Sequence, residues 1–396
     1  MPSRFVQIHF LTAYPASLLN RDDVGFAKRI PFGGVTRTRI SSQCLKRHWR
    51  TFEGQGALKE IPDPNTGRPV PFAIRSRHTF EREIAGPLKE KGHAPEVVDA
   101  VVGALMTEVL GKKDKAKGSD GLQTNQVTVL GRPEVEYLKW IAEELCRDNG
   151  DADVAAKAAK ERTKEIRRNL QALRLGTGLD AALFGRMVTS DNLARCDAAV
   201  HVAHAFTVHA EEAEADYFSA VDDLLQGPEA EEAELGSGHI GSAELTSGLF
   251  YGYVVVDVPL LVSNLEGCEQ KDWLGADRRL ASEVVARLVR LVATVSPGAK
   301  RGSTAPYAYA DFVMVEAGDA QPCTLANAFL KPVPARGNVL AEAYQALASY
   351  LERFDEVYAP GNVRRYVSLS QASPLAGAEP CGSLHELAAW AADRVA

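Results

Sequence analysis

The chain has 396 residues, a net charge of −7, 45% hydrophobic residues and 24% charged residues. These proportions are ordinary for a globular protein, and the negative net charge argues against a protein whose whole surface coats nucleic acid. Six scattered cysteines without a CxxC pair predict free thiols and neither a zinc site nor disulfides. The sequence shows no signal-peptide layout and no apolar run near the ~20 residues of a membrane span, so we expect a cytoplasmic protein.

The first half of the chain predicts two strands followed by a largely helical segment. Strand patterns cover residues 5–13 and 36–40, and a helix is expected over 41–52 with Ser41 or Ser42 as its N-cap. A Pro- and Gly-rich stretch at 54–71 interrupts this order. Helical periodicity then recurs over residues 77–91, 95–110, 133–147 and 151–173. A Lys-, Gly- and Ser-rich stretch at 111–124 predicts a loop between the second and third of these helices.

Residues 196–270 differ from the rest because they contain no lysine or arginine and carry a dense run of acids. Two strand-like segments, 201–209 and 245–256, flank a Gly- and Pro-containing tip, which predicts an extended, hairpin-like excursion. The remaining elements are helices at 277–294, 339–357 and 384–395 and strands at 311–316 and 366–369. Without residues 54–189 and the excursion, a β–α–β…β–α–β order remains. It predicts an α+β fold with an RRM- or ferredoxin-like sheet and helices on one face.

Residues 24–52 are the most informative for function, because they hold seven cations and no acid. Four polar residues of the expected helix recur at helical spacing and share one face: Gln43, Lys46, Arg47 and Arg50. Leu45 and Trp49 occupy another face and can anchor the helix. A helix N-terminus followed by a cationic face suits a phosphate backbone. A solvated basic helix face is the commoner alternative, and the pattern does not name the anion.

Basic residues also occur at three other places in the sequence, each with a different set of neighbouring residues. The lysines of 157–164 are interleaved with glutamates, which favours an exposed charged helix. Lys300 and Arg301 lie in a Gly/Pro/Ser loop near two tyrosines, a composition that suits a nucleic-acid strand and a surface loop equally. Arg186 precedes Met187, which could wedge against a base, although such a methionine more often fills a core.

No motif for catalysis is present. The sequence has no P-loop, no GxSxG and no HExxH. His201 and His204 are three apart in a strand-like segment, which would place them on opposite faces, so a metal site is disfavoured. We therefore expect neither an enzyme nor a bound cofactor.

Eight short motifs, in order along most of the chain, resemble the backbone subunit family of the CRISPR type I-E Cascade complex (CasC). They are LNRDD at 19–23, FGG at 32–34, RTRISSQCLKR at 37–47, GRM at 185–187, AVDDL at 220–224, SGLFY at 247–251, PGAK at 297–300 and LANAF at 325–329. The resemblance implies an RRM-like palm (residues 1–53, 180–203 and 250–396), a helical finger insertion (54–179) and a thumb (204–249).

The same resemblance implies a function in antiviral defence. Several copies would polymerise along one guide RNA (crRNA), each thumb reaching the neighbouring copy. This ribonucleoprotein complex, which includes other Cascade subunits, would pair the exposed guide with a target DNA strand. A separate nuclease-helicase would cut the DNA.

Residue by residue, the resemblance implies guide-RNA contacts at Asn20, Arg21, Lys28, Arg39, Ser41, Ser42, Gln43, Lys46 and Arg50, with Met187 as the wedge. The charge pattern adds Arg37, Arg47, Arg186, Lys300 and Arg301. The candidates for contact with target DNA are Lys157, Lys160 and Lys164.

Two alternatives stay open. A related backbone subunit could cleave target RNA with a metal and a thumb aspartate, because Asp216, Asp222 and Asp223 lie in the acidic excursion. An unrelated RRM-like module could bind cellular RNA. The acidic thumb tip at residues 229–234 and the long stretch at 54–71 both depart from the family pattern.

Overall fold

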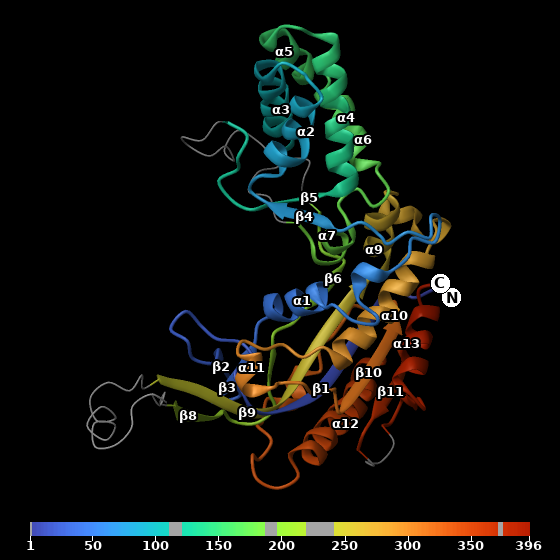
Figure 1. Cartoon of the computed structure of the whole chain (residues 1–396). Helices are drawn as coiled ribbons and strands as arrows, with labels where there is room; N and C mark the ends of the chain where they lie inside the picture. Colours follow the sequence, from blue (N-terminus) through green and yellow to red (C-terminus); the bar gives the residue numbers. More distant parts are fainter. Residues whose placement is uncertain (1, 111–120, 187–195, 219–240, 371–374) are drawn as a thin grey trace, which may run out of the picture.

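The computed structural model describes residues 2–110, 121–186, 196–218, 241–370 and 375–396. Ten strands of this part form one mixed sheet (Figure 1), whose path is β12-β11-β10-β1-β9-β7-β3-β2, with β6 and β8 also paired to β9. The bounds are β1 Phe5–Ser17, β2 Arg29–Phe32, β3 Val35–Ile40, β6 Val200–Val202, β7 Ala205–Thr207, β8 Glu212–Phe218, β9 Gly241–Asp257, β10 Phe312–Gly318, β11 Val363–Ser368 and β12 Glu379–Pro380. The predicted α+β class is confirmed.

Strand β1 lies at the centre of the sheet and is covered on both faces. Val6, Ile8 and Phe10 pack into a core with α1 (Ser42–Thr51), α9 (Val258–Glu266), α10 (Arg279–Thr294) and α13 (Leu384–Asp393). On the other face Leu11 joins a core that includes residues of α12 (Val339–Tyr358) and the short helix η5 (Ala326–Phe329). The expectation of helices on one face only is therefore wrong.

Residues 54–179, which we call the finger insertion, contain a hydrophobic core of their own. This core draws its buried side chains from residues 80–170. Its helices are η2 (Phe80–Ala85), α2 (Gly86–Glu90), α3 (Pro95–Leu110), α4 (Arg132–Asp148), α5 (Ala152–Glu161) and α6 (Thr163–Gln171). A two-stranded sheet of β4 (Ala73–Ser76) and β5 (Thr128–Gly131) lies at its base, and the helices project away from the main sheet (Figure 1). The helix expected over 151–173 is divided into two at Arg162.

The acidic excursion is a hairpin, but its arms differ from the expected ones. Strand β8 pairs with β9 from Glu212↔Ser247 to Phe218↔Gly241. The segment expected as one arm, residues 201–209, instead forms the short strands β6 and β7 inside the sheet. Strand β8 was not predicted because the segment is rich in acids. Its acids alternate with Ala213, Ala215 and Tyr217, a pattern typical of a strand that is exposed to solvent. The predicted tip lies outside the described residues.

In the described ranges, no helix is long and apolar enough to cross a membrane.

Candidate nucleic-acid interface

Helix α1 is fixed at its start and anchored along one face. Ser41 is the N-cap, and its hydroxyl accepts a hydrogen bond from the Cys44 amide at 3.3 Å. The Asn20 side-chain oxygen accepts from the Ser41 amide at 2.8 Å. Leu45 and Trp49 are buried in the core. The predicted helix and cap are confirmed, and Asn20 and Ser41 both use their polar groups to hold the start of α1.

The polar face of α1 is open to solvent. Gln43 and Arg47 are exposed, whereas Lys46 and Arg50 are partly buried and burial lowers the pKa of both. Ser42 is also partly buried, and its hydroxyl lies 3.4 Å from the Gln43 side-chain oxygen. The first turn contains no acid. Positive charge therefore runs along one side of a helix whose other side is fixed in the core.

The loop that ends at Lys300 and leads into the short helix α11 (Arg301–Thr304) lies beside α1. The Ala299 amide donates to the Leu18 carbonyl at 2.9 Å, which joins the loop to the end of β1. Burial raises the pKa of Cys44 to about 11, and the charges of Lys28, Arg47 and Arg301 oppose this rise. Lys28 and Arg301, from two other segments, therefore lie near enough to the first turn of α1 to act on Cys44 together with Arg47. We call Lys28, Arg39, Gln43, Lys46, Arg47, Arg50, Lys300 and Arg301 the basic strip.

Lys28 and Arg39 extend the basic strip along the hairpin of β2 and β3. The Lys28 amide donates to the Asn20 carbonyl at 2.9 Å, and the Arg39 amide donates to the Lys28 carbonyl at 2.7 Å. The Arg39 guanidinium lies 3.2 Å from Nδ1 of His204. Arg21, which is exposed, forms a backbone bridge with Ala27 in the preceding loop. A shallow surface pocket at this point is lined by Asp22, Asp23, Ala27, Lys28, Arg29 and Arg39.

Arg29 ties this hairpin to the acidic one. Its Nε donates to Glu211 at 2.5 Å, and its Nη2 donates to Glu244 on β9. Glu244 also accepts from the Ala27 amide at 2.6 Å, and the Glu211 amide donates to the Thr36 carbonyl. We call Arg29, Glu211 and Glu244 the acidic clamp. It neutralises Arg29 and fixes the β2–β3 hairpin against the base of the β8–β9 hairpin.

The family model for CT1975-like protein matches residues 6–390. This chain belongs to the CT1975-like protein family. A solved chain titled "CRISPR RNA-guided surveillance complex, pre-nicking" is 30% identical with a TM-score of 0.77, and the match covers 99% of this chain and 100% of that chain. A chain titled "CRISPR RNA-guided surveillance complex" is 27% identical with a TM-score of 0.66, covering 98% and 99%. No curated protein matches this one. The predicted resemblance to Cascade-type CRISPR proteins is confirmed.

Two predicted contacts of this CT1975-like protein are inaccessible. Arg37 is 0% exposed, and its guanidinium donates to the carbonyls of Phe32, Thr207 and Phe329 at 3.2, 3.0 and 2.9 Å. Arg186 is 4% exposed and forms a two-pronged ion pair with Glu134 at 2.6 and 3.0 Å. Neither guanidinium faces solvent, so both stabilise the fold, and the prediction that they contact a phosphate is withdrawn. Met187 lies outside the described residues.

The basic helices of the finger insertion are separate from the basic strip. Lys157 and Lys160 on α5 and Lys164 on α6 are exposed. Between these helices Arg162 pairs with Glu144 at 3.0 Å and with Glu165 at 3.1 Å. This surface therefore mixes both signs of charge, as the sequence predicted.

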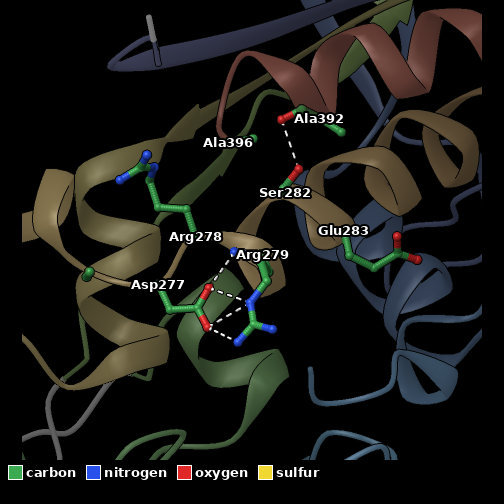
Figure 2. Close-up of a pocket in the computed structure, with 8 residues that line it drawn as sticks. Asp277, Arg278, Arg279, Ser282, Glu283, Ala392 and Ala396 are labelled. Carbon is green, nitrogen blue, oxygen red and sulfur yellow. Dashed lines mark hydrogen bonds and ion pairs between the residues drawn. The ribbon is translucent and has the colours of Figure 1, made fainter. Parts of the chain in front are cut away.

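A pocket beside the C-terminal residues offers no comparable site. It is lined by residues 276–279, Ser282 and Glu283 of the α10 region and by Ala392 and Ala396 (Figure 2). The Arg279 guanidinium donates to Asp277 and to Asn65. The hydrogen bonds from Arg279 lower the pKa of Asp277 to about 2. Ser282 donates to the Ala392 carbonyl at 2.9 Å. The charged groups in this pocket largely neutralise one another.

Proposed function

We propose that this protein is a non-catalytic, guide-RNA-binding backbone subunit of a Cascade complex. Several copies would line one guide RNA, hold it by its phosphates and leave its bases free to pair with a target DNA strand. Other Cascade subunits would complete the complex, and a separately recruited nuclease-helicase would cut the DNA. We expect this assembly to act in the cytoplasm.

The observation that carries the proposal is the meeting of separate chain segments at the start of α1. The side chain of Asn20 accepts from the Ser41 amide at 2.8 Å, and its carbonyl accepts from the Lys28 amide at 2.9 Å. The Ala299 amide, beside Lys300 and Arg301, donates to the Leu18 carbonyl at 2.9 Å, so cations that lie far apart in the sequence are held near the start of α1. Such a concentration of cations on a protein with a net charge of −7 suits one strand held in one groove. Holding the strand by its backbone leaves base pairing to read the sequence.

Two further features support the proposal. The path β10-β1-β9-β7, with α1 and α10 packed in one core, is consistent with an RRM-like palm. The solved chains that resemble this one across nearly their full length belong to RNA-guided surveillance complexes by title. The exposed lysines of α5 and α6 would then be available to approach target DNA.

The RNA that co-purifies with the protein tests the proposal most broadly. We expect a pool of short RNAs that share one repeat-derived end, because each copy of the protein binds the same transcript class. Sequencing the extracted RNA checks this. A diverse pool of cellular transcripts would favour a general RNA-binding module, and the absence of RNA from the assembled protein would count against both readings.

A further inference from the structure

His204 lies beside the basic strip, and the sequence indicated no role for it beyond a disfavoured metal site. It follows β6 and directly precedes β7, which pairs with β3 at Arg39↔Phe206 and Ile40↔Ala205. This pairing brings the exposed ring of His204 to the side chain of Arg39, with 3.2 Å between Arg39 Nη1 and His204 Nδ1. Two residues that are 165 positions apart in the sequence therefore meet in one contact.

The chemistry of this contact fixes the protonation of His204 in the free protein. A guanidinium carries only hydrogen-bond donors, so Arg39 donates and the His204 Nδ1 accepts. A ring nitrogen that accepts carries no proton, so the imidazole is neutral and its proton lies on Nε2. The surroundings favour the same state, because burial and the charges of Arg39 and Lys28 lower the pKa of His204.

Arg39 is oriented by neutral groups and not by an acid. Its Nε donates to the Arg29 carbonyl at 3.2 Å, and its Nη1 donates to His204. Among the residues that the structure describes, neither Arg39 nor Lys28 forms an ion pair. The position is thus prepared for an anion that the protein itself does not supply.

The nearest acids do not supply that anion. Asp22 and Asp23 line the same shallow pocket as Lys28 and Arg39. The Oδ1 of Asp22 accepts from three backbone amides of its own turn, at 3.0, 2.8 and 2.9 Å. These hydrogen bonds commit Asp22 to its turn, and no contact joins either acid to His204 within the described ranges.

We propose that binding of a nucleic-acid phosphate beside Arg39 is coupled to the uptake of one proton by His204. The inference rests on the proposed function and extends it. The phosphate replaces Nδ1 as the acceptor for Arg39, and it adds a negative charge where two cations had kept the ring neutral. A proton from solvent then binds Nδ1, and the imidazolium donates to the phosphate. His204 is therefore a contact that forms only when the strand is bound.

The test measures guide-RNA affinity against pH at constant salt for the wild type and for His204→Gln, which keeps polar groups but does not titrate. We expect the wild-type affinity to rise roughly 3–10-fold from about pH 8 to about pH 6, because uptake of one proton changes affinity by at most about tenfold per pH unit. His204→Gln should show a smaller rise. Titration calorimetry in two buffers of different ionisation enthalpy should show that this variant takes up fewer protons.

His201→Gln is the matched control. His201 is exposed on β6, and its Nε2 lies 3.0 Å from the Ala198 carbonyl, so we expect the wild-type pH profile in this variant. His48 on α1 is a second histidine near the basic strip. Its Nδ1 contacts the Cys44 carbonyl at 2.8 Å, and burial lowers its pKa. Because His48 is present in both variants, its contribution cancels in their comparison.

The same pH series for binding of complementary DNA to the RNA-loaded protein identifies the strand. A His204-dependent rise in the RNA measurement assigns the phosphate to the guide, and one confined to the DNA measurement assigns it to the target strand. Identical profiles for wild type and His204→Gln in both measurements would overturn the inference. Weaker wild-type binding at the lower pH would also overturn it, because neutral His204 would then only orient Arg39. If guide RNA binds equally well across the series, the coupling fails and the proposed function stands.

Discussion

Helix α1 and the helices α5 and α6 both carry several cations, but the surroundings of those cations differ. The first turn of α1 contains no acid, and where burial raises the pKa of the Cys44 thiol there, the charges of Lys28, Arg47 and Arg301 all act to lower it. Around α5 and α6, Arg162 is paired with Glu144 and Glu165. Charge that is compensated within the protein stabilises the fold, whereas uncompensated charge remains available to a ligand. The neighbours of a cation therefore predict its role better than the number of cations does.

The largest expected effect comes from breaking a fully compensated pair. Arg186→Ala leaves Glu134 buried without its cation, since Glu134 is 5% exposed. Removing one partner of a buried ion pair typically costs about 3–5 kcal/mol. Urea unfolding should show this loss, while the salt slope of RNA binding by the folded protein should not change. A changed slope with unchanged stability would contradict the role given to Arg186.

A second compensated site predicts loss of stability in acid. Burial raises the pKa of Glu316, but the hydrogen bond from His9 at 2.9 Å and the charges of His9 and Arg364 outweigh this effect and lower the pKa to about 2. The buried network also contains Tyr251 and Asp355, bonded to His9 and Arg364. Because the pKa of Glu316 is lower in the folded protein than its ordinary value of 4.5, the ionised carboxylate stabilises the fold at pH values above 4.5. This contribution is lost as the pH falls towards 2.

The size of this acid effect is about 3 kcal/mol, since each unit of pKa corresponds to about 1.4 kcal/mol. Urea unfolding at a series of pH values measures it. The variant Glu316→Gln should be less stable at neutral pH and should lose less stability between pH 5 and pH 2. Parallel pH profiles for the two proteins would show that Glu316 does not titrate as described.

Removing the acidic clamp tests whether the ion pairs that neutralise Arg29 also support the binding of guide RNA. In Glu211→Gln/Glu244→Gln, two negative charges near the basic strip are removed, so simple Coulomb attraction predicts tighter RNA binding. We expect weaker binding, by roughly 3–10-fold, because the β2–β3 hairpin loses the ion pairs of its Arg29 with Glu211 and Glu244. These ion pairs hold in place the segment that carries Lys28 and Arg39. Fluorescence anisotropy with labelled guide RNA decides between the two directions. Tighter binding would show that the clamp does not position the basic strip.

The smallest effect is expected in the finger insertion. Replacing Lys157, Lys160 and Lys164 by alanine should leave guide-RNA affinity within about twofold, because these exposed lysines lie apart from the basic strip. Association with target DNA should slow, most clearly at low salt, since exposed charges act mainly on encounter. Stopped-flow association of labelled DNA with the RNA-loaded protein measures this change. An equally large loss of guide-RNA affinity would show that the lysines of α5 and α6 and the basic strip do not have different roles.

Local patterns predicted much of the fold, and long-range contacts explain what they missed. Arg37 and Arg39 were both predicted to contact RNA and lie two residues apart in β3, yet only Arg37 is buried, because its guanidinium donates to the carbonyls of Thr207 and Phe329. Nothing in the local sequence indicates those partners. The cap at Ser41 and the anchors of α1 depend on neighbours within one turn, so they were predictable.

The same distinction applies to the candidate site. The acid-free segment identified the α1 face, whereas the approach of Arg301 to Cys44 and of His204 to Arg39 arises from tertiary packing. Arg186 was misjudged because its partner Glu134 lies 52 residues away in the finger insertion. Sequence patterns revealed where charge is concentrated, and only the structure revealed which charges are neutralised.

The salt dependence of guide-RNA binding tests the central claim most directly. Lys46 and Arg301 come from different segments of the basic strip, and neither forms an ion pair with an acid among the residues that the structure describes. The control variant Lys89→Ala/Lys91→Ala removes two cations of the finger insertion that pair with Asp99 and Glu143. For Lys46→Ala/Arg301→Ala we predict weaker binding and a salt slope smaller in magnitude by about 1.4, the value for two phosphates. An unchanged slope in this variant, or an equal change in the control, would contradict the account.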